Sequence, residues 1–177
     1  GIVSRLTRPL LEKALSAAAR WPDEVRLSFN LSNHDISSSE GVVRIVGIVL
    51  RSGIDPGRID FELTETAIMR DFEQVKAAIG TIKALGCGIS MDDFGTGYSS
   101  LSQLHALPLT KIKIDRSFVT DLHQRPASYK IVKSLIALSR DMGLGCVIEG
   151  VETADELSAL VRLGGFEFQG YYYSPPM

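Results

Sequence analysis

Hydrophobic positions along the chain follow two alternating patterns. Short apolar runs rich in β-branched residues alternate with longer stretches in which apolar residues recur at helical spacing. The first pattern is typical of buried strands and the second of amphipathic helices. The predicted strands are Val25–Leu31, Ile59–Leu63, Gly88–Met91, Lys111–Ile114, Cys146–Ile148 and Phe166–Phe168. Strands that alternate with helices predict an α/β fold with a mostly parallel sheet.

Capping and turn residues mark the predicted helices. Ser37–Glu40 and Thr153–Glu156 match the capping box, in which a hydroxyl and a carboxylate satisfy backbone amides of the first turn. We therefore expect a helix to begin at each of these segments. The other predicted helices are about Arg8–Arg20, Asp71–Leu85 and Pro126–Met142.

Composition narrows the class of protein. The 177 residues include 45% hydrophobic residues, and 19 basic against 21 acidic side chains give a net charge of −2. These values are ordinary for one globular domain, and the near-neutral charge argues against a partner that is a nucleic-acid polymer. Apolar runs fall well short of the roughly 20 residues of a spanning helix, so we expect no direct membrane insertion and a cytoplasmic location. Cys87 and Cys146 are expected to be buried, reduced thiols.

Polar residues lie at or just after the carboxyl end of every predicted strand. They recur about once per β-α unit, which takes roughly 31 residues in a barrel. Because the carboxyl ends of parallel strands form the rim where active sites are built, we expect these side chains to converge. The residues are Asn30, Glu62, Glu65, Asp92, Asp93, Lys113, Asp115, Glu149, Glu152 and Gln169.

Convergent carboxylates predict a cation site. A single acidic residue after a strand is often a helix cap, and Asp115 fits that role, while Glu152 fits a charge beside the first turn of the helix at Thr153. Several acids in one pocket would repel one another unless a cation neutralised them. The adjacent Asp92 and Asp93 can both face the pocket if the backbone turns at the strand end. An all-oxygen ligand set favours one or two Mg²⁺ or Mn²⁺ ions, with Ca²⁺ expected to bind as an inhibitor.

Two further features adjoin the predicted cation site. Lys113 is the one cation among the strand-end residues, and it either pairs with a carboxylate or contacts a phosphate or an attacking water. The segment Gly95–Ser100 contains two glycines and small hydroxyl residues. We predict that it forms a flexible loop beside the aspartates.

Several ordered motifs resemble those of one known family. The family is that of the EAL-domain cyclic di-GMP phosphodiesterases, and the resemblance covers nearly the whole chain. It implies a TIM-like (β/α) barrel and metal-dependent hydrolysis of one phosphodiester bond of cyclic di-GMP to the linear dinucleotide. The matching segments are Phe61–Glu65, Asp92–Leu101, Lys113–Asp115, Glu149–Glu152 and Gln169–Tyr171, with Asn30–Ser32 similar to a strand-end Asn motif.

The resemblance also implies roles for individual residues. Lys113 and Glu149 would act in catalysis, with Lys113 and Gln169 contacting substrate. Glu65 would anchor the loop after Asp93, and Glu152 would anchor a neighbouring loop. The implied metal ligands are Asn30, Glu62, Asp92, Asp93 and Glu149.

The sequence departs from the family pattern at its beginning. The Glu-Ala-Leu motif, whose Glu is a metal ligand, is absent, and about six of the eight β-α units of a barrel are visible. We therefore interpret residues 1–177 as a single EAL-like domain that lacks its first strands, with impaired activity. Open sheet edges predict a homodimer. The parent protein is expected to carry other signalling domains, with or without a membrane tether.

Two other functions are consistent with parts of the pattern. A member of the family without catalysis would bind cyclic di-GMP as a receptor or regulatory module. An enolase-type barrel also places acids on successive strands around Mg²⁺, and Lys111 and Lys113 superficially fit its lysine base. The segment Asp92–Leu101 has no place in that second alternative.

Overall fold

The computed structural model describes residues 2–97 and 100–175, with side chains from residue 6 onward. It divides into two compact units, which are described separately. The first contains residues 1–90 and 100–109, and the second contains residues 91–99 and 110–177. Tyr98 and Ser99, which belong to the predicted flexible loop, lie outside the described residues.

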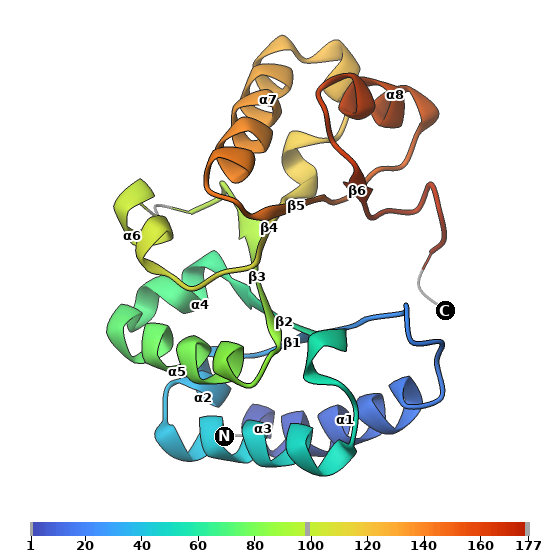
Figure 1. Ribbon diagram of the computed structural model, residues 1–177. Helices are drawn as coiled ribbons and strands as arrows, with labels where there is room; N and C mark the ends of the chain where they lie inside the picture. The colour runs from blue at the N-terminus through green and yellow to red at the C-terminus, as the bar shows by residue number, and fades with distance from the viewer. Residues whose placement is uncertain (1, 98–99, 176–177) are drawn as a thin grey trace. The chain divides into compact units, whose positions relative to one another are not determined.

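The first unit contains a pair of parallel strands, β1 (Leu27–Asn30) and β2 (Ile59–Thr64), with helices before and between them (Figure 1). Strand β1 pairs with β2 in parallel, so that Leu27 lies opposite Ile59 and Asn30 opposite Glu62. Strand β3 (Gly88–Phe94) follows β2 in the sheet and continues into the second unit. The elements that precede β3 are α1 (Ile2–Ala18), β1 (Leu27–Asn30), α2 (Asn33–Ile36), α3 (Ser39–Ser52), η1 (Pro56–Arg58), β2 (Ile59–Thr64), α4 (Glu65–Arg70) and α5 (Phe72–Ala84), and α6 (Leu101–Ala106) also belongs to this unit.

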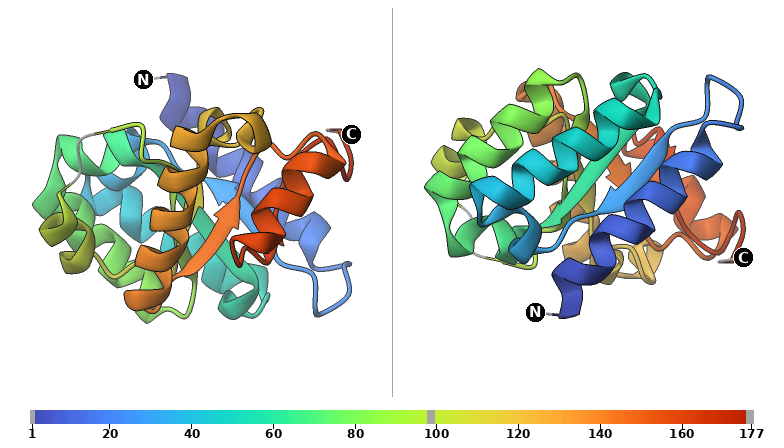
Figure 2. Two further views of the ribbon diagram at one scale, coloured as in Figure 1. Left: turned by 90° about the horizontal axis from the view of Figure 1, so that it is seen from above. Right: turned by 90° about the horizontal axis from the view of Figure 1, so that it is seen from below.

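Helices α1, α3 and α5 lie side by side in the first unit (Figure 2, right). The apolar residues of each helix recur at helical spacing, so they lie on one face of the helix, and that face is buried. Leu11 and Leu15 of α1 are buried, as are Ile45 and Val49 of α3. Strand β2 is buried over nearly its whole length, as expected for a strand covered on both faces.

The second unit contains the other parallel strands. Strand β4 pairs in parallel with β5, and β5 with β6. Helix α7 packs against β4 and β5 (Figure 2, left). The elements after β3 in this unit are β4 (Lys111–Ile114), η2 (Arg116–Phe118), η3 (Leu122–Gln124), α7 (Pro126–Asp141), β5 (Gly145–Ile148), α8 (Ala154–Arg162) and β6 (Glu167–Phe168).

The structure confirms the α/β class and most of the predicted elements. The start of α7 at Pro126 and the capping box at Thr153 are as predicted. Strand β3 extends to Phe94 rather than ending at Met91, so it includes both predicted aspartate ligands. Cys87 and Cys146 are buried free thiols, as expected. Among the described residues, no helix combines the length and the apolar character needed to cross a membrane.

The predicted capping box at Ser37 is wrong. Ser38 is the N-cap of α3 and accepts a hydrogen bond from the amide of Gly41. Ser37 instead ends the short helix α2, where its hydroxyl donates to the carbonyl of Asn33. The three consecutive serines at this point offer equivalent cap chemistry, so sequence alone does not single out the residue that begins the helix. Helices α2, α4 and α6 are not among the predicted helices.

Candidate active site

The second unit brings four predicted site residues to the carboxyl ends of neighbouring strands. Asp92 and Asp93 lie at the end of β3, Lys113 lies on β4, and Glu149 directly follows β5. The parallel ladder continues to Glu149, because its backbone nitrogen donates to the carbonyl of Ile114 at 3.1 Å. This bond ties the start of the loop after β5 to the end of β4.

The backbone turns between the two aspartates. Asp93 has a φ of 55°, in the left-handed region that non-glycine residues rarely adopt. Its backbone nitrogen donates to Oδ1 of Asp92 at 3.1 Å. In a regular strand, consecutive side chains point to opposite faces. The left-handed turn explains how both carboxylates reach one place, which confirms the expected geometry of this pair.

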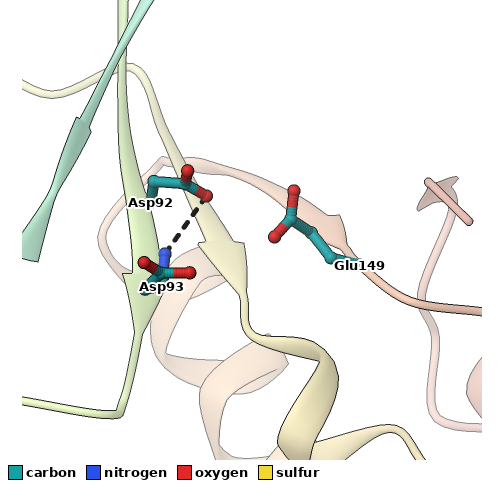
Figure 3. A group of neighbouring side chains, drawn as sticks. All are labelled: Asp92, Asp93 and Glu149. Atoms are coloured by element: carbon teal, nitrogen blue, oxygen red, sulfur yellow. Dashed lines mark hydrogen bonds between the residues drawn. The ribbon is translucent and has the colours of Figure 1, made fainter. Parts of the chain in front are cut away.

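Three carboxylates form a compact cluster. One oxygen each of Asp92, Asp93 and Glu149 lies within 4.8 Å of the other two. The carboxylates of Asp92 and Glu149 are turned toward each other (Figure 3). Their side chains are 16% and 18% exposed, so the cluster is mostly shielded but reachable from solvent. Carboxylate oxygens at this spacing fit a hard divalent cation such as Mg²⁺, Mn²⁺ or Ca²⁺.

Lys113 extends its ammonium group into the same cluster. Its Nζ lies 2.6 Å from Oε1 of Glu149 and 3.3 Å from Oδ1 of Asp92. The side chain is 6% exposed. Of the two roles predicted for Lys113, pairing with a carboxylate is confirmed. The contact with a phosphate or water stays a prediction.

The acidic cluster perturbs Asp93 most clearly. Burial raises the pKa of Asp93, and the negative charges of Asp92 and Asp115 raise it further, while the ammonium group of Lys113 acts in the opposite direction. Asp115 itself has a second role: its Oδ1 accepts a hydrogen bond from the amide of Ser117 at 2.9 Å, which confirms the predicted role of Asp115 as a cap. The part of the rise in the pKa of Asp93 that comes from the neighbouring negative charges is the part that a bound cation would relieve.

Three predicted site residues belong to the first unit. Asn30 and Glu62 are partners in the β1–β2 register at the carboxyl ends of their strands. Asn30 is exposed, whereas Glu62 is buried. Glu65 is buried in the first turn of α4. Metal ligation by Asn30 and Glu62 and loop anchoring by Glu65 stay predictions.

The other two predicted residues, Gln169 and Glu152, present exposed side chains in the second unit. The backbone of Gln169 accepts from Val151 and donates to Ile148, so it joins the end of β6 to β5. The backbone nitrogen of Glu152 donates to the carboxylate of Glu156 at 2.9 Å. Substrate contact by Gln169 and loop anchoring by the Glu152 side chain stay predictions.

Two contacts beside the cluster were missed by sequence reasoning. Gly150 approaches Arg116 so closely that a Cβ on Gly150 would lie 2.2 Å from the Arg116 Cβ. The ring of Phe118 lies against Gly95, where an added Cβ would be 3.0 Å from the ring. These contacts join the loops that follow β3, β4 and β5. Gly95, two residues after Asp93, and Gly150, directly after Glu149, indicated a close approach of other residues, but sequence alone did not identify Phe118 and Arg116.

Comparison with known proteins identifies the family. The EAL domain family model matches residues 1–176, and the chain therefore belongs to the EAL domain family. It is 36% identical over 179 residues to the cyclic di-GMP phosphodiesterase PA2567 of Pseudomonas aeruginosa, a match that covers 97% of this chain and 30% of that relative. The chain spans 22%, 21% and 25% of the length of relatives from Caulobacter vibrioides, Sinorhizobium fredii and Azorhizobium caulinodans.

Solved structures share the fold. The PaMucR phosphodiesterase in complex with c-di-GMP superimposes with a TM-score of 0.94 at 34% identity, over 100% of this chain and 73% of that chain. BlrP1 of Klebsiella pneumoniae, solved with manganese and cyclic di-GMP, gives a TM-score of 0.86 at 30% identity, over 95% of this chain and 43% of that chain. BlrP1 has also been solved with calcium and cyclic di-GMP. These matches confirm that the strands and helices are those of the TIM-like EAL barrel, of which this chain forms a part.

Proposed function

We propose that this chain is a metal-dependent phosphodiesterase domain that hydrolyses one phosphodiester bond of cyclic di-GMP to give the linear dinucleotide. The observation that carries the proposal is the cluster of Asp92, Asp93 and Glu149 with the ammonium group of Lys113 against it. Membership of the EAL family and the names of its relatives support the choice of substrate.

The carboxylates would hold one or two divalent cations. Asp92, Asp93 and Glu149 supply oxygen ligands from the second unit. We propose that Asn30 and Glu62, at the ends of β1 and β2, complete the ligand set. A divalent cation here would polarise a phosphate oxygen and increase the acidity of a bound water. The complexes of BlrP1 with cyclic di-GMP and either manganese or calcium support a divalent cation at this place. We propose Mn²⁺ or Mg²⁺ as the working ion and Ca²⁺ as an inhibitor.

Lys113 and Glu149 have complementary roles in this proposal. The buried ammonium group of Lys113 would orient the attacking water or donate to a non-bridging phosphate oxygen, where negative charge grows in the transition state. Glu149, 2.6 Å from that ammonium group, would accept the proton of the water. The side-chain amide of Gln169 is exposed at the end of β6 and would contact the substrate.

The direct test is the conversion of cyclic di-GMP to its linear product, followed by chromatography with Mn²⁺, Mg²⁺ or EDTA. We expect turnover with Mn²⁺ and none with EDTA. Asp92→Asn and Glu149→Gln should each lower kcat by about a hundredfold or more, because each loses a ligand charge. The control is Asp155→Asn, which removes an exposed acid in the first turn of α8 and should leave turnover unchanged.

The receptor alternative predicts a different result. Tight binding of cyclic di-GMP without linear product at saturating Mn²⁺ would refute hydrolysis and support a binding module. We further propose that the chain acts within a longer signalling protein, as the short coverage of its relatives suggests. The homodimer and the cytoplasmic location stay predictions that sedimentation and cell fractionation of that protein can test.

A further inference from the structure

A buried carboxylate outside the proposed catalytic group joins two loops of the second unit. Glu156 lies in the first turn of α8 and is 4% exposed. Its Oε2 accepts from the backbone nitrogens of Glu152 and Thr153, at 2.9 and 3.1 Å. Its Oε1 accepts from the backbone nitrogen of Asp121 at 3.0 Å. Each oxygen therefore binds a different part of the chain.

One of the two loops carries Glu149 of the proposed catalytic pair, and the other follows the strand that carries Lys113. Glu152 lies three residues after Glu149, in the loop between β5 and α8. Asp121 lies in the segment after β4, the strand that carries Lys113. The contact between Gly150 and Arg116 brings the same two segments together nearer to the strand ends. The hydrogen bonds of Glu156 thus connect the loop before α8 to the segment that follows β4.

A helix cap needs the bonds that Oε2 of Glu156 accepts, but it does not need the bond that Oε1 accepts from Asp121. In a capping box, the third residue of the helix satisfies amides at the helix entrance, and the bonds to Oε2 do this. The bond from Asp121 contributes nothing to α8, because Asp121 precedes Glu156 by 35 residues. Asp121 has a φ of 55°, a conformation that persists in non-glycine residues when surrounding contacts hold it.

We propose that Glu156 is a positioning residue whose two carboxylate oxygens hold the loop after β5 to the segment after β4 and thereby keep Glu149 in place beside Lys113. The proposal rests on the proposed function insofar as Glu149 is a metal ligand. It concerns the support of that ligand and needs no further cofactor. Residues that orient metal ligands in this way commonly affect metal affinity when they are replaced.

Two variants separate positioning from capping. In Glu156→Gln, the amide oxygen can still accept from Glu152 and Thr153, but the opposite side presents an N–H group to the amide of Asp121. Thr153→Ala is the matched control, since it removes the hydroxyl that accepts from the Glu156 nitrogen at 3.2 Å and leaves the bond to Asp121 intact. Glu156→Asp retains the charge but is too short to span both loops, and serves if the Gln variant does not fold by circular dichroism.

The measurements are amide exchange at Asp121 by NMR and the Mn²⁺ dissociation constant by titration calorimetry. For Glu156→Gln we expect exchange about tenfold faster, as for loss of a hydrogen bond to a charged group, and Mn²⁺ binding about tenfold weaker. For Thr153→Ala both values should stay within about twofold of wild type. With cyclic di-GMP, Glu156→Gln should lower kcat while KM changes little.

The outcomes are distinct. Equal effects of both variants would show that Glu156 only caps α8 and would overturn the proposal. Faster exchange at Asp121 with unchanged Mn²⁺ affinity would also overturn it, because the loops would then be joined without consequence for Glu149. If the wild-type chain bound Mn²⁺ but did not hydrolyse cyclic di-GMP, the proposed function would fail while the exchange and calorimetry still tested Glu156.

Discussion

Replacing Lys113 with Met tests how the protein balances its acidic cluster. The substitution keeps an unbranched apolar side chain and removes the ammonium group from Asp92 and Glu149. The three side chains are 6%, 16% and 18% exposed, so solvent screens this interaction weakly. We therefore expect the loss to affect stability, which a surface ion pair seldom does.

The magnitude follows from the distances. At an effective dielectric constant of about 20, charges separated by 2.6 and 3.3 Å attract by about 6 and 5 kcal/mol. Most of this offsets the cost of taking the charges out of water, and removing one partner of a buried pair costs about 3–5 kcal/mol. We expect Lys113→Met to lower the free energy of unfolding by about 3 kcal/mol in EDTA, because the carboxylates keep some contact with water.

The assay is urea-induced unfolding followed by circular dichroism, in EDTA and in Mn²⁺. The matched control is Lys111→Met on the same face of β4, where Lys111 pairs with Glu167 at 3.4 Å and the side chains are 24% and 38% exposed. This more exposed pair should cost less than about 1 kcal/mol. Mn²⁺ should stabilise Lys113→Met more than wild type, by about 1.4 kcal/mol for each tenfold gain in affinity, because the ammonium group no longer shares the carboxylates.

Three results would refute this reasoning. A loss below about 1 kcal/mol in EDTA would show that the Lys113 ammonium group is not the main counter-charge of the cluster. An equal gain from Mn²⁺ in both proteins would show that Lys113 and the cation do not share ligands. A loss in Lys111→Met as large as in Lys113→Met would mean that the stability change comes from strand β4 in general.

Three further predictions concern Gly150, Glu156 and Cys87. Gly150→Ala places a methyl group 2.2 Å from the Arg116 Cβ at a φ of +72°, and should lower the free energy of unfolding by about 2 kcal/mol in urea titrations. Burial acts to raise the pKa of Glu156, but the hydrogen bonds from backbone amides and a hydroxyl outweigh burial and lower the pKa. The ionised carboxylate therefore stabilises the fold at pH values above the ordinary pKa of 4.5, and this contribution is lost as the pH falls below that value. The difference in unfolding free energy between wild type and Glu156→Gln should therefore shrink in acid, and a constant difference would contradict the assignment. Burial, followed by the charge of Asp60, raises the pKa of Cys87 to about 11, so iodoacetamide at neutral pH should label it only after unfolding, as mass spectrometry can show.

The sequence predicted the strands and the strand-end residues well, because both depend on local signals. Strand β5 contains the short apolar run Cys146–Ile148 that was predicted, and β4 was predicted with the bounds that the structure shows, although lysines alternate with isoleucines in it. The turn that brings Asp92 and Asp93 together was anticipated from their position at a strand end. The pairing of Lys113 with carboxylates was one of the two roles that the sequence left open for this residue.

Other features depend on contacts that are distant in the sequence. The carboxylate of Glu156 was interpreted as a cap, and its bond to Asp121 spans 35 residues, which no local pattern reveals. The start of α3 was displaced by one residue because neighbouring serines have the same cap chemistry. Helix α6 was missed because six residues are too few for an amphipathic pattern to stand out.

The left-handed backbone at Asp93 makes the length of β3 as important as its composition. Two acidic groups reach the same place only because the chain reverses its alternation at this one position. Inserting or deleting a single residue upstream would rotate both of them away at once, whereas exchanging one apolar side chain for another would leave them where they are. Among natural variants, this strand should therefore tolerate substitutions of its residues far more readily than insertions or deletions.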